Sequence, residues 1–359
     1  MYAAGALARE ASDGGGPLVD LRFAVQLGII GLTFFMLINA SAILVLAERK
    51  IMGFMQQRHG PYLVGPHGML QPLADILKLL MKEELRPKGA DKWLFTLAPV
   101  LAVTAAFTAF ATVPWGAETT LFGLLDEPVS LGVADVNVGA LVVFAVTSMG
   151  VYGIVIAGWA SNSKYSLLGG LRASAQMISY ELSYATALAA VVLMAGSLSL
   201  REVVDGQSGY WFGFIPRWYL FLQPVGFLIY MIAGIAETNR APFDFPEAEQ
   251  ELVAGYNTEY SSVRFALFPQ AEYINMTTMS AVATDLYLGG WHGPFLPPEY
   301  GWIWFLVKVG ALLFFYIWMR WTVPRYRYDQ LMQFGWKFLF PAAVINLLVT
   351  AAVFLYFNA

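Results

Sequence analysis

Eight long apolar segments constrain the fold of this chain more than any other feature of its sequence. A helix that crosses the roughly 30 Å hydrocarbon core of a bilayer needs about 20 predominantly apolar residues. The composition agrees with membrane insertion, since 58% of the residues are hydrophobic and only 13% are charged, against about 25% charged in soluble domains. We therefore expect an all-α integral membrane protein with eight transmembrane helices, at residues 23–47, 93–115, 138–160, 178–198, 219–236, 265–288, 302–319 and 336–357.

Lysine and arginine residues predict how this bundle is oriented. Sixteen of the 21 fall on one side of the expected membrane and four on the other, with Lys308 inside a segment. By the positive-inside rule, the loops that follow the odd-numbered helices lie inside, and both termini lie outside. Residues 1–22 lack a compact apolar core followed by a cleavage site, so we interpret them as an N-terminal extension and not as a signal peptide. The whole chain, 1–359, is then a single membrane domain.

The first inner loop, residues 48–92, contains a short amphipathic segment at about 69–82. Asp75, Lys78 and Lys82 fall on one face of a helix drawn through it. Its apolar positions recur at helical spacing on the other face: Met69, Leu70, Leu73, Ile76, Leu77, Leu80 and Met81. The segment is too short and too charged to span a bilayer, so we expect a helix in the membrane interface. It is either an ordinary surface helix or one wall of a lateral entrance for a lipid-soluble substrate.

Acidic residues gather in and beside a second inner loop, residues 237–264. The loop contains Glu237, Asp244, Glu247, Glu249, Glu251 and Glu259. Glu181 and Glu272 lie on expected membrane helices, where an ionisable group is costly and usually functional. Carboxylates that are close together in partly dry surroundings can exchange protons. A proton relay is one interpretation, and contact between the loop acids and arginines of a partner protein is the other.

Two further charges interrupt the expected helices on the outer side. Asp285 lies close to the outer face, where we expect water to solvate it. Lys308 lies about 9 Å from the outer end of its helix at about 1.5 Å per residue. It could serve as a counter-ion for a buried carboxylate, or its ammonium could reach outward to the interface.

The residue types that are missing limit the chemistry of the chain itself. The sequence has no cysteine, three histidines and no glycine-rich nucleotide-binding pattern. Thiolate metal sites and iron–sulfur clusters on this chain are therefore excluded. If electrons pass nearby, cofactors on other chains must carry them.

Several long motifs resemble one known family. They are AERKIMGFMQQRHGPYLVGPHGMLQPLADILKLLMKE, GLRASAQMISYELS, AETNRAPFDFPEAEQELVAGYNTEYS, FALFPQAEYINM and PRYRYDQLMQFGWK. In this order they resemble the quinone-site membrane subunit of respiratory complex I, a family found in bacterial NADH-quinone oxidoreductases and in the mitochondrial enzyme. The likeness extends from about residue 49 to 337.

The resemblance implies a subunit that forms a ubiquinone chamber with the hydrophilic arm of the complex. FMN and the Fe–S clusters would belong to partner subunits, and this chain would bind no redox cofactor and would not act alone. It implies a proton-coupling chain made of Glu181, Glu237, Glu247, Glu249, Glu251, Glu259 and Glu272. It also implies that a second set lines or supports the quinone chamber and its entrance: Arg49, Arg58, Asp75, Arg172, Arg240, Leu70, Leu73 and Leu77.

Other functions predict different features. A stand-alone proton-coupled transporter predicts inverted repeats, which we do not find in the sequence. A membrane subunit of a related membrane-bound hydrogenase, where no quinone is reduced, is separated from complex I only by its partners. The N-terminal extension and the segment LRPKGADKW favour a bacterial plasma membrane over a mitochondrion.

Overall fold

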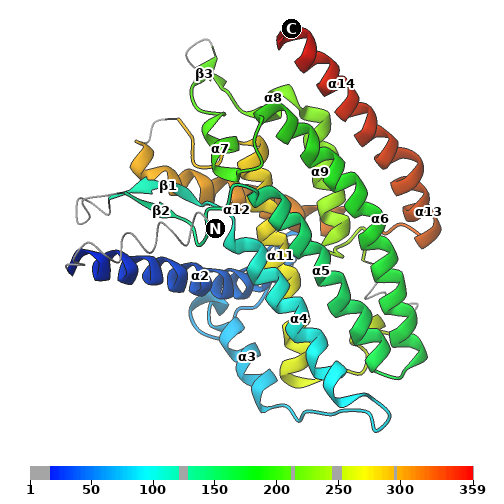
Figure 1. Cartoon of the computed structure of the whole chain (residues 1–359). Coiled ribbons are helices and arrows are strands. Elements are labelled where there is room, and N and C mark those ends of the chain that lie inside the picture. The colour runs from blue at the N-terminus through cyan, green and yellow to red at the C-terminus, as the bar shows by residue number, and fades with distance from the viewer. Residues whose placement is uncertain (1–16, 121–127, 212–214, 245–252, 295–296, 359) are drawn as a thin grey trace.

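The computed structural model describes residues 17–120, 128–211, 215–244, 253–294 and 297–358. Helices make up most of this part of the chain (Figure 1). Two small antiparallel sheets of two strands each interrupt the loops between helices. They pair β1 (Gly116–Thr119) with β2 (Val129–Leu131), and β3 (Tyr210–Trp211) with β4 (Ile215–Pro216).

Six helical segments in the described ranges are long and apolar enough to cross a membrane. The last of them begins as α13, passes through the π-helical turn η4 (Gly335–Leu339) and continues as α14. The helices are α2 (Pro17–Met55), α4 (Lys92–Ala111), α5 (Gly139–Ala160), α6 (Lys164–Ala195), α12 (Gly301–Thr322), α13 (Tyr328–Phe334) and α14 (Phe340–Asn358). These six coincide with six of the eight segments predicted from the apolar pattern.

The other two predicted segments are also helical, but neither meets the criteria of length and apolarity for a span. The 14-residue α9 (Pro224–Glu237) follows the single turn α8 (Tyr219–Leu222). At about 1.5 Å per residue it is only about 21 Å long. The 26-residue α11 (Ser262–Tyr287) is long enough, but it carries charged residues, among them Glu272 and Asp285. Both helices pack inside the bundle, and α11 is buried along most of its length.

Two helix boundaries differ from the prediction because charged and glycine-containing segments remain helical. Helix α2 begins at Pro17 and ends at Met55, so it includes the last residues of the predicted extension and the first of the predicted inner loop. Helix α6 begins at Lys164, well before the predicted start at 178. Glycine weakens an isolated helix by about 1 kcal/mol relative to alanine, but here tertiary packing decides. A Cβ on Gly170 would lie 3.3 Å from Gly158 Cα of α5.

Short helices occupy the loops. They are η1 (Pro66–Gly68), α3 (Gln71–Met81), α7 (Leu200–Asp205), η2 (Gly255–Asn257) and η3 (Pro298–Tyr300). Helix α3 lies within the segment predicted to be amphipathic, and it packs against α2 and α11. Leu70, Leu73 and Leu77 are 50%, 56% and 51% exposed. The apolar face of α3 therefore does not enter the core of this chain.

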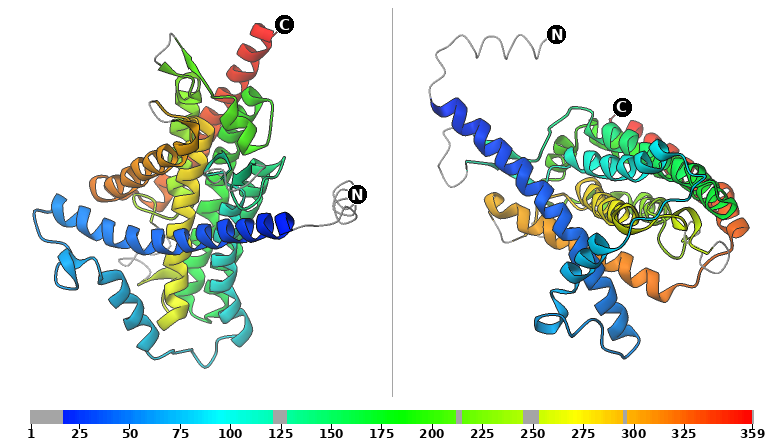
Figure 2. Two further views of the ribbon diagram at one scale, coloured as in Figure 1. Left: turned by 90° about the vertical axis from the view of Figure 1, so that its left-hand side faces the viewer. Right: turned by 90° about the horizontal axis from the view of Figure 1, so that it is seen from below.

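The bundle has a layered arrangement. Helices α4, α5 and α6 pack in sequence, and α6 also contacts α9 and α14. Helix α2 crosses the others at a steep angle, as the side view in Figure 2 shows. The loop that carries α3 and the connection between α5 and α6, both predicted to lie inside, are at the end of the bundle that is lowest in Figure 1 and is called the basic end below. The connection between α12 and α13, also predicted to lie inside, is nearer mid-height. The termini of the described chain and both small sheets lie away from the basic end.

Candidate functional site

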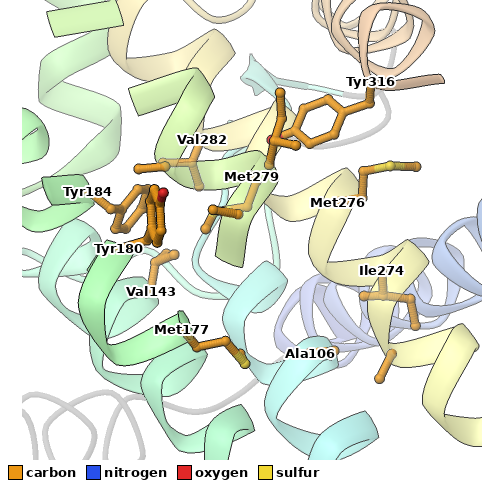
Figure 3. Close-up of a cluster of buried hydrophobic side chains, with 14 of the residues drawn as sticks. Ala106, Val143, Met177, Tyr180, Tyr184, Ile274, Met276, Met279, Val282 and Tyr316 are labelled. Carbon is orange, nitrogen blue, oxygen red and sulfur yellow. The ribbon is translucent and has the colours of Figure 1, made fainter. Parts of the chain in front are cut away.

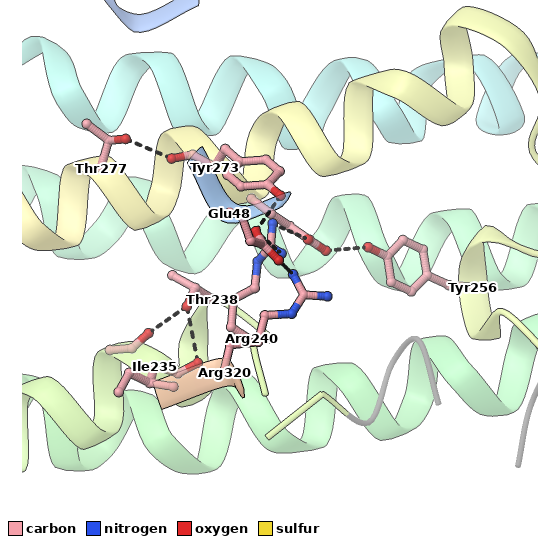
Figure 4. A network of polar contacts seen from close by, with 10 residues as sticks. Glu48, Ile235, Thr238, Arg240, Tyr256, Tyr273, Thr277 and Arg320 are labelled. Carbon is pink, nitrogen blue, oxygen red and sulfur yellow. Dashed lines mark hydrogen bonds and ion pairs between the residues drawn. The ribbon is translucent and has the colours of Figure 1, made fainter. Parts of the chain in front are cut away.

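Four charged side chains meet inside the bundle near its basic end (Figure 4). Glu48 comes from α2, Arg240 from the turn after α9, Glu272 from α11 and Arg320 from α12. Glu48, Arg240 and Glu272 are each less than a tenth exposed. The cluster therefore joins four distant parts of the chain in surroundings from which water is largely excluded.

Arg240 links the two carboxylates of this cluster. Its Nη1 lies 3.6 Å from Glu48 Oε2, and its Nη2 lies 3.6 Å from Glu272 Oε2. The guanidinium also lies over the ring of Tyr273, with its central carbon 4.2 Å from the ring centroid. This is the cation–π arrangement that desolvation strengthens.

Hydrogen bonds pair the remaining carboxylate oxygens. Tyr273 Oη donates to Glu48 Oε2 at 2.7 Å, and Tyr256 Oη donates to Glu272 Oε1 at 3.0 Å. Arg320 donates to Glu48 Oε1. With two acids and two guanidinium groups the cluster is neutral when all four are ionised. Buried charges are tolerated only when they are paired and hydrogen-bonded in this way.

Two contacts hold the chain around Arg240 and Tyr256 in place. The buried Nε2 of Gln176 donates to the carbonyls of Ala236 at 2.8 Å and Phe243 at 2.7 Å, on either side of the turn that carries Arg240. The chain at Tyr256 packs closely against α6, where a Cβ added to Gly169 would lie 2.7 Å from the backbone nitrogen of Tyr256. Only glycine at position 169 lets η2 approach α6 this closely.

A second pair of carboxylates lies further along α6 and α9. The Oγ of Ser148 on α5 donates to Glu181 Oε1, and the hydroxyl of Thr147 lies beside Glu237. The two acids interact electrostatically with each other. Glu237 is buried at the last position of α9.

One acid of each group lines a shared cavity. Its lining includes Glu237, Asn239, Glu272 and Asn275. Glu237 Oε2, Asn239 Oδ1 and Asn275 Oδ1 are buried and have no hydrogen-bond partner among the described residues. Buried polar oxygens are normally paired with protein or with water. The lining of the cavity is largely apolar, but there is room for about one water molecule, which these three oxygens could bind.

Arg49 and Asp75 form a separate pair at the junction of α2 and α3. Arg49 Nη1 lies 2.6 Å from Asp75 Oδ2, and Gln71 Nε2 donates to Asp75 Oδ1 at 3.0 Å. The neighbouring Lys50 donates to the carbonyl of His67 at 2.6 Å. These bonds fix α3 against the end of α2, with the exposed apolar side chains of α3 beside the pair.

The other predicted site residues lie apart from the buried cluster. Arg58 is exposed and donates to Gln56 Oε1 at 2.7 Å. The guanidinium of Arg172 lies over the ring of Tyr328 at 5.6 Å. Glu259 is half-buried just before α11. Three predicted acids lie outside the described residues: Glu247, Glu249 and Glu251.

Sequence reasoning missed four members of the cluster. Glu48 was placed at the start of the first inner loop, and Arg320 was counted only among the inner basic residues. Tyr256 and Tyr273 were not considered as hydrogen-bond donors to the acids. Glu48 could have been found as an acid beside Arg49 on an apolar helix, and Tyr273 as the neighbour of Glu272. Arg320 and Tyr256 carry no such local signal.

The expectation for Asp285 was wrong. Asp285 is fully buried. Gln207, in the loop after α7, donates a hydrogen bond from Nε2 to the Asp285 carbonyl, and α12 packs against α11. Lys308 is buried, and its ammonium reaches the loop that follows α11. Its ammonium donates to the carbonyls of Leu288 at 2.6 Å, Gly290 at 2.8 Å and His292 at 2.6 Å, and it interacts electrostatically with Asp285.

A family model described as NADH dehydrogenase matches residues 27–351 of the chain. The chain belongs to this family. Its relatives include H subunits of bacterial NADH-quinone oxidoreductases. The first of two such subunits in Geobacter metallireducens is 53% identical over 92% of this chain and 97% of the relative. The second of two in Geobacter sulfurreducens is 51% identical over 94% and 99%. The H subunit of Syntrophotalea carbinolica is 50% identical over 90% and 94%.

Membership in the NADH dehydrogenase family confirms the resemblance found in the motifs. Together with the six long apolar helices, it makes the chain an integral membrane protein. The described residues contain no group of three or more His, Cys, Asp or Glu side chains that could hold a metal ion. The site consists of buried acids, guanidinium groups and tyrosines that are joined by ion pairs and hydrogen bonds.

Proposed function

We propose that this chain is the membrane subunit in which a proton-translocating NADH:quinone oxidoreductase couples quinone reduction to proton movement. Three observations support this: the family, the names of relatives that match over nearly their whole length, and the buried acids at the basic end. In this proposal α9 and α11 join the six apolar helices to give eight spans in one membrane domain. The basic end faces the cytoplasm of a bacterial cell, where partner subunits with FMN and Fe–S clusters dock.

The junction of α2 and α3 is the proposed quinone entrance. The leucines of α3 leave an apolar face uncovered by this chain, as expected of a helix that meets lipid or a lipid-soluble substrate. Arg49 and Asp75 lie at one end of that face. Ubiquinone would pass along α3 and reach a chamber completed by the partner subunits. Arg58 and Arg172, on the same side of the chain, would face those partners.

Arg240 is central to the proposed coupling, because its guanidinium lies 3.6 Å from the carboxylates of both Glu48 and Glu272. Reduction of quinone nearby adds negative charge, and in surroundings of low dielectric constant such a charge acts strongly over several ångströms. Movement of the guanidinium toward that charge would leave Glu272 less well paired and favour its protonation. The cavity would then pass a proton between Glu272 and Glu237, with Glu181 next to it.

Glu237→Gln and Glu181→Gln test this proposal in the assembled complex. Glu299→Gln, at an exposed acid in η3 away from the cavity, is the control. We expect the first two variants to lower NADH-driven proton translocation in proteoliposomes, while Glu299→Gln moves protons as the unmodified enzyme does. The complex is first purified by mild detergent through a tag on this chain, and its subunits are identified by mass spectrometry. Normal coupled activity of both variants would refute the relay, and copurification with hydrogenase subunits would refute the assignment.

A further inference from the structure

A line of buried polar side chains runs along α9, away from the basic end. Gln223, Tyr230 and Glu237 are each seven residues apart, so they lie on one stripe of the helix. Fourteen residues at about 1.5 Å each make this stripe about 21 Å long. All three side chains are less than a tenth exposed. Polar groups at this spacing inside an apolar bundle are costly unless they serve a purpose.

Near Glu237 the line begins with Tyr184 of α6 and Tyr316 of α12. Both phenol groups interact electrostatically with Glu237. Figure 3 shows these two tyrosines entering the core from different helices. Tyr316 Oη is buried without a hydrogen-bond partner among the described residues, as is Glu237 Oε2. The Tyr316 hydroxyl and one oxygen of Glu237 are therefore both available for a further hydrogen bond, for example to a water molecule.

Tyr230 continues the line. Its hydroxyl lies 3.4 Å from the hydroxyl of Tyr184 and 3.2 Å from the carbonyl of Met279. Its ring lies 4.9 Å from the Tyr184 ring and 5.5 Å from the Tyr287 ring, between centroids. The Tyr230 and Tyr287 hydroxyls also interact electrostatically. All three tyrosines have no exposed surface.

Beyond Tyr287 the line ends in a hydrogen-bonded group on α14. The Tyr287 hydroxyl and Gln223 Oε1 both lie beside Gly226 of α9. A Cβ added to this glycine would be 3.6 Å from the hydroxyl and 2.9 Å from Oε1. Asn346 Nδ2 donates to Gln223 Oε1 at 2.9 Å, and Gln223 Nε2 donates to Thr350 Oγ1 at 2.5 Å. This group lies at the end of α9 that is remote from the basic end.

We propose that Tyr184, Tyr230 and Tyr287 form a proton path between Glu237 and the side of the membrane opposite the basic end. The inference rests on the proposed function, in which Glu237 accepts a proton. Each phenol would receive a proton on its oxygen and release its own to the next acceptor, so each is regenerated and no electrons move. The Tyr316 hydroxyl, which also interacts electrostatically with Glu237, would be a second group at the entrance.

Core filling alone does not account for this arrangement. Phenylalanine would supply the same aromatic volume without burying a hydroxyl, and burial of a hydroxyl is unfavourable unless it is hydrogen-bonded. Four tyrosines from α6, α9, α11 and α12 nevertheless place their hydroxyls around one axis that starts at an acid. Tyr184 Oη and Tyr230 Oη are hydrogen-bonded to each other. Tyr230 Oη also lies 3.2 Å from the Met279 carbonyl, and Tyr287 Oη donates to the Ala187 carbonyl at 3.4 Å.

The test replaces single hydroxyls in the intact complex: Tyr184→Phe, Tyr230→Phe and Tyr287→Phe. Tyr180→Phe is a matched control, since Tyr180 lies one turn from Tyr184 on α6, is equally buried and donates to the carbonyl of Leu331 at 2.9 Å, off the line. Each purified variant is reconstituted in proteoliposomes. Protons moved per NADH oxidised, and the rate of quinone reduction with an uncoupler present, are measured in water and in deuterium oxide.

We expect the three line variants to lose part of the protons moved per NADH while the uncoupled rate matches that of Tyr180→Phe. We also expect the solvent isotope effect on proton movement to change only in the line variants. Normal proton yield in all three would overturn the path. If Glu237→Gln lowers the yield but the line variants do not, the coupling role stands and the path fails. If Glu237→Gln itself pumps normally, the proposed function fails first.

Discussion

Tyr273 donates a 2.7 Å hydrogen bond to Glu48, a residue 225 positions earlier in the chain. The same tyrosine offers the face of its ring to Arg240, which lies 3.6 Å from Glu48. One side chain of α11 therefore orients both an acid of α2 and the cation that neutralises it. The first helix of the described chain is tied to the later ones through charge and not through apolar packing alone.

Arg240→Met should destabilise the subunit severely. The change leaves Glu48 and Glu272 buried without their shared cation, and removal of one partner of a buried ion pair typically costs about 3–5 kcal/mol. We expect a lower thermal transition of the complex in lipid nanodiscs, or failure of the chain to assemble. Arg217→Met, at an exposed guanidinium outside the cluster, is the control and should melt as the unmodified protein does. Equal melting of both variants would show that the cluster does not stabilise the fold.

Tyr273→Phe should have a smaller effect that is specific to Glu48. The ring remains for Arg240, whereas Glu48 loses its shortest hydrogen bond from an uncharged donor, which contributes about 1.5–3 kcal/mol when the acceptor is charged. We expect assembly to be retained and the rate of quinone reduction to fall. Tyr273→Leu removes the ring as well and should melt at a lower temperature than Tyr273→Phe. If the two variants melt alike, the contact between Arg240 and the ring contributes nothing.

Gly169→Ala should disturb Tyr256 from a distance. The new methyl group would lie 2.7 Å from Gly255 Cα and from the backbone nitrogen of Tyr256, closer than real contacts allow. Overpacking of this kind costs about 1–3 kcal/mol, and it moves η2 away from Glu272. We expect reduced coupled activity. A Cβ at position 310 of α12 would have no atom within 4 Å, so Gly310→Ala should leave the activity unchanged. Its melting temperature should stay the same or rise slightly, because alanine favours a helix more than glycine does.

Lys308→Met and Asp285→Asn should be coupled in a double-mutant cycle. Lys308→Met leaves three carbonyls without their donor and Asp285 without its nearest cation. The double variant restores charge balance, so its loss of stability should be smaller than the sum of the single losses, by about 0.5–3 kcal/mol. Thermal melting of the four proteins gives this difference. Strict additivity would mean that the two charges do not interact.

The sequence predicted the helices well, because apolar length and spacing act locally along the chain. Each of the eight predicted segments is helical, but only six of them are confirmed as long and apolar enough to cross a membrane. The errors at residues 48–55 and 164–177 arose where a helix continues through polar residues. Nothing in those stretches favours a turn strongly, but neither do they show the apolar pattern on which the prediction relied. Packing of Gly170 against Gly158 decides the second case.

The members of the charge cluster could be predicted only in part. Glu272 and Arg240 were visible as charges beside apolar segments. Their partners Glu48 and Arg320 join them only because α2 and α12 cross α11 near its middle, which no local pattern encodes. The prediction that water solvates Asp285 was wrong for the same reason. The position of a residue along a helix predicts its depth in the membrane, but not whether another segment buries it.

The length of α2 has a mechanical consequence. Its 39 residues extend about 58 Å, nearly twice the hydrocarbon thickness of a bilayer, and Figure 2 shows it inclined across the other helices. A slanted helix accommodates a thicker or thinner bilayer by changing its inclination. Glu48 and Arg49 lie near one end of α2, where a small change in the inclination of the helix displaces its residues the most. The acyl-chain length of the surrounding lipid is thereby linked to the position of both charges, and the membrane itself becomes a part that adjusts the site.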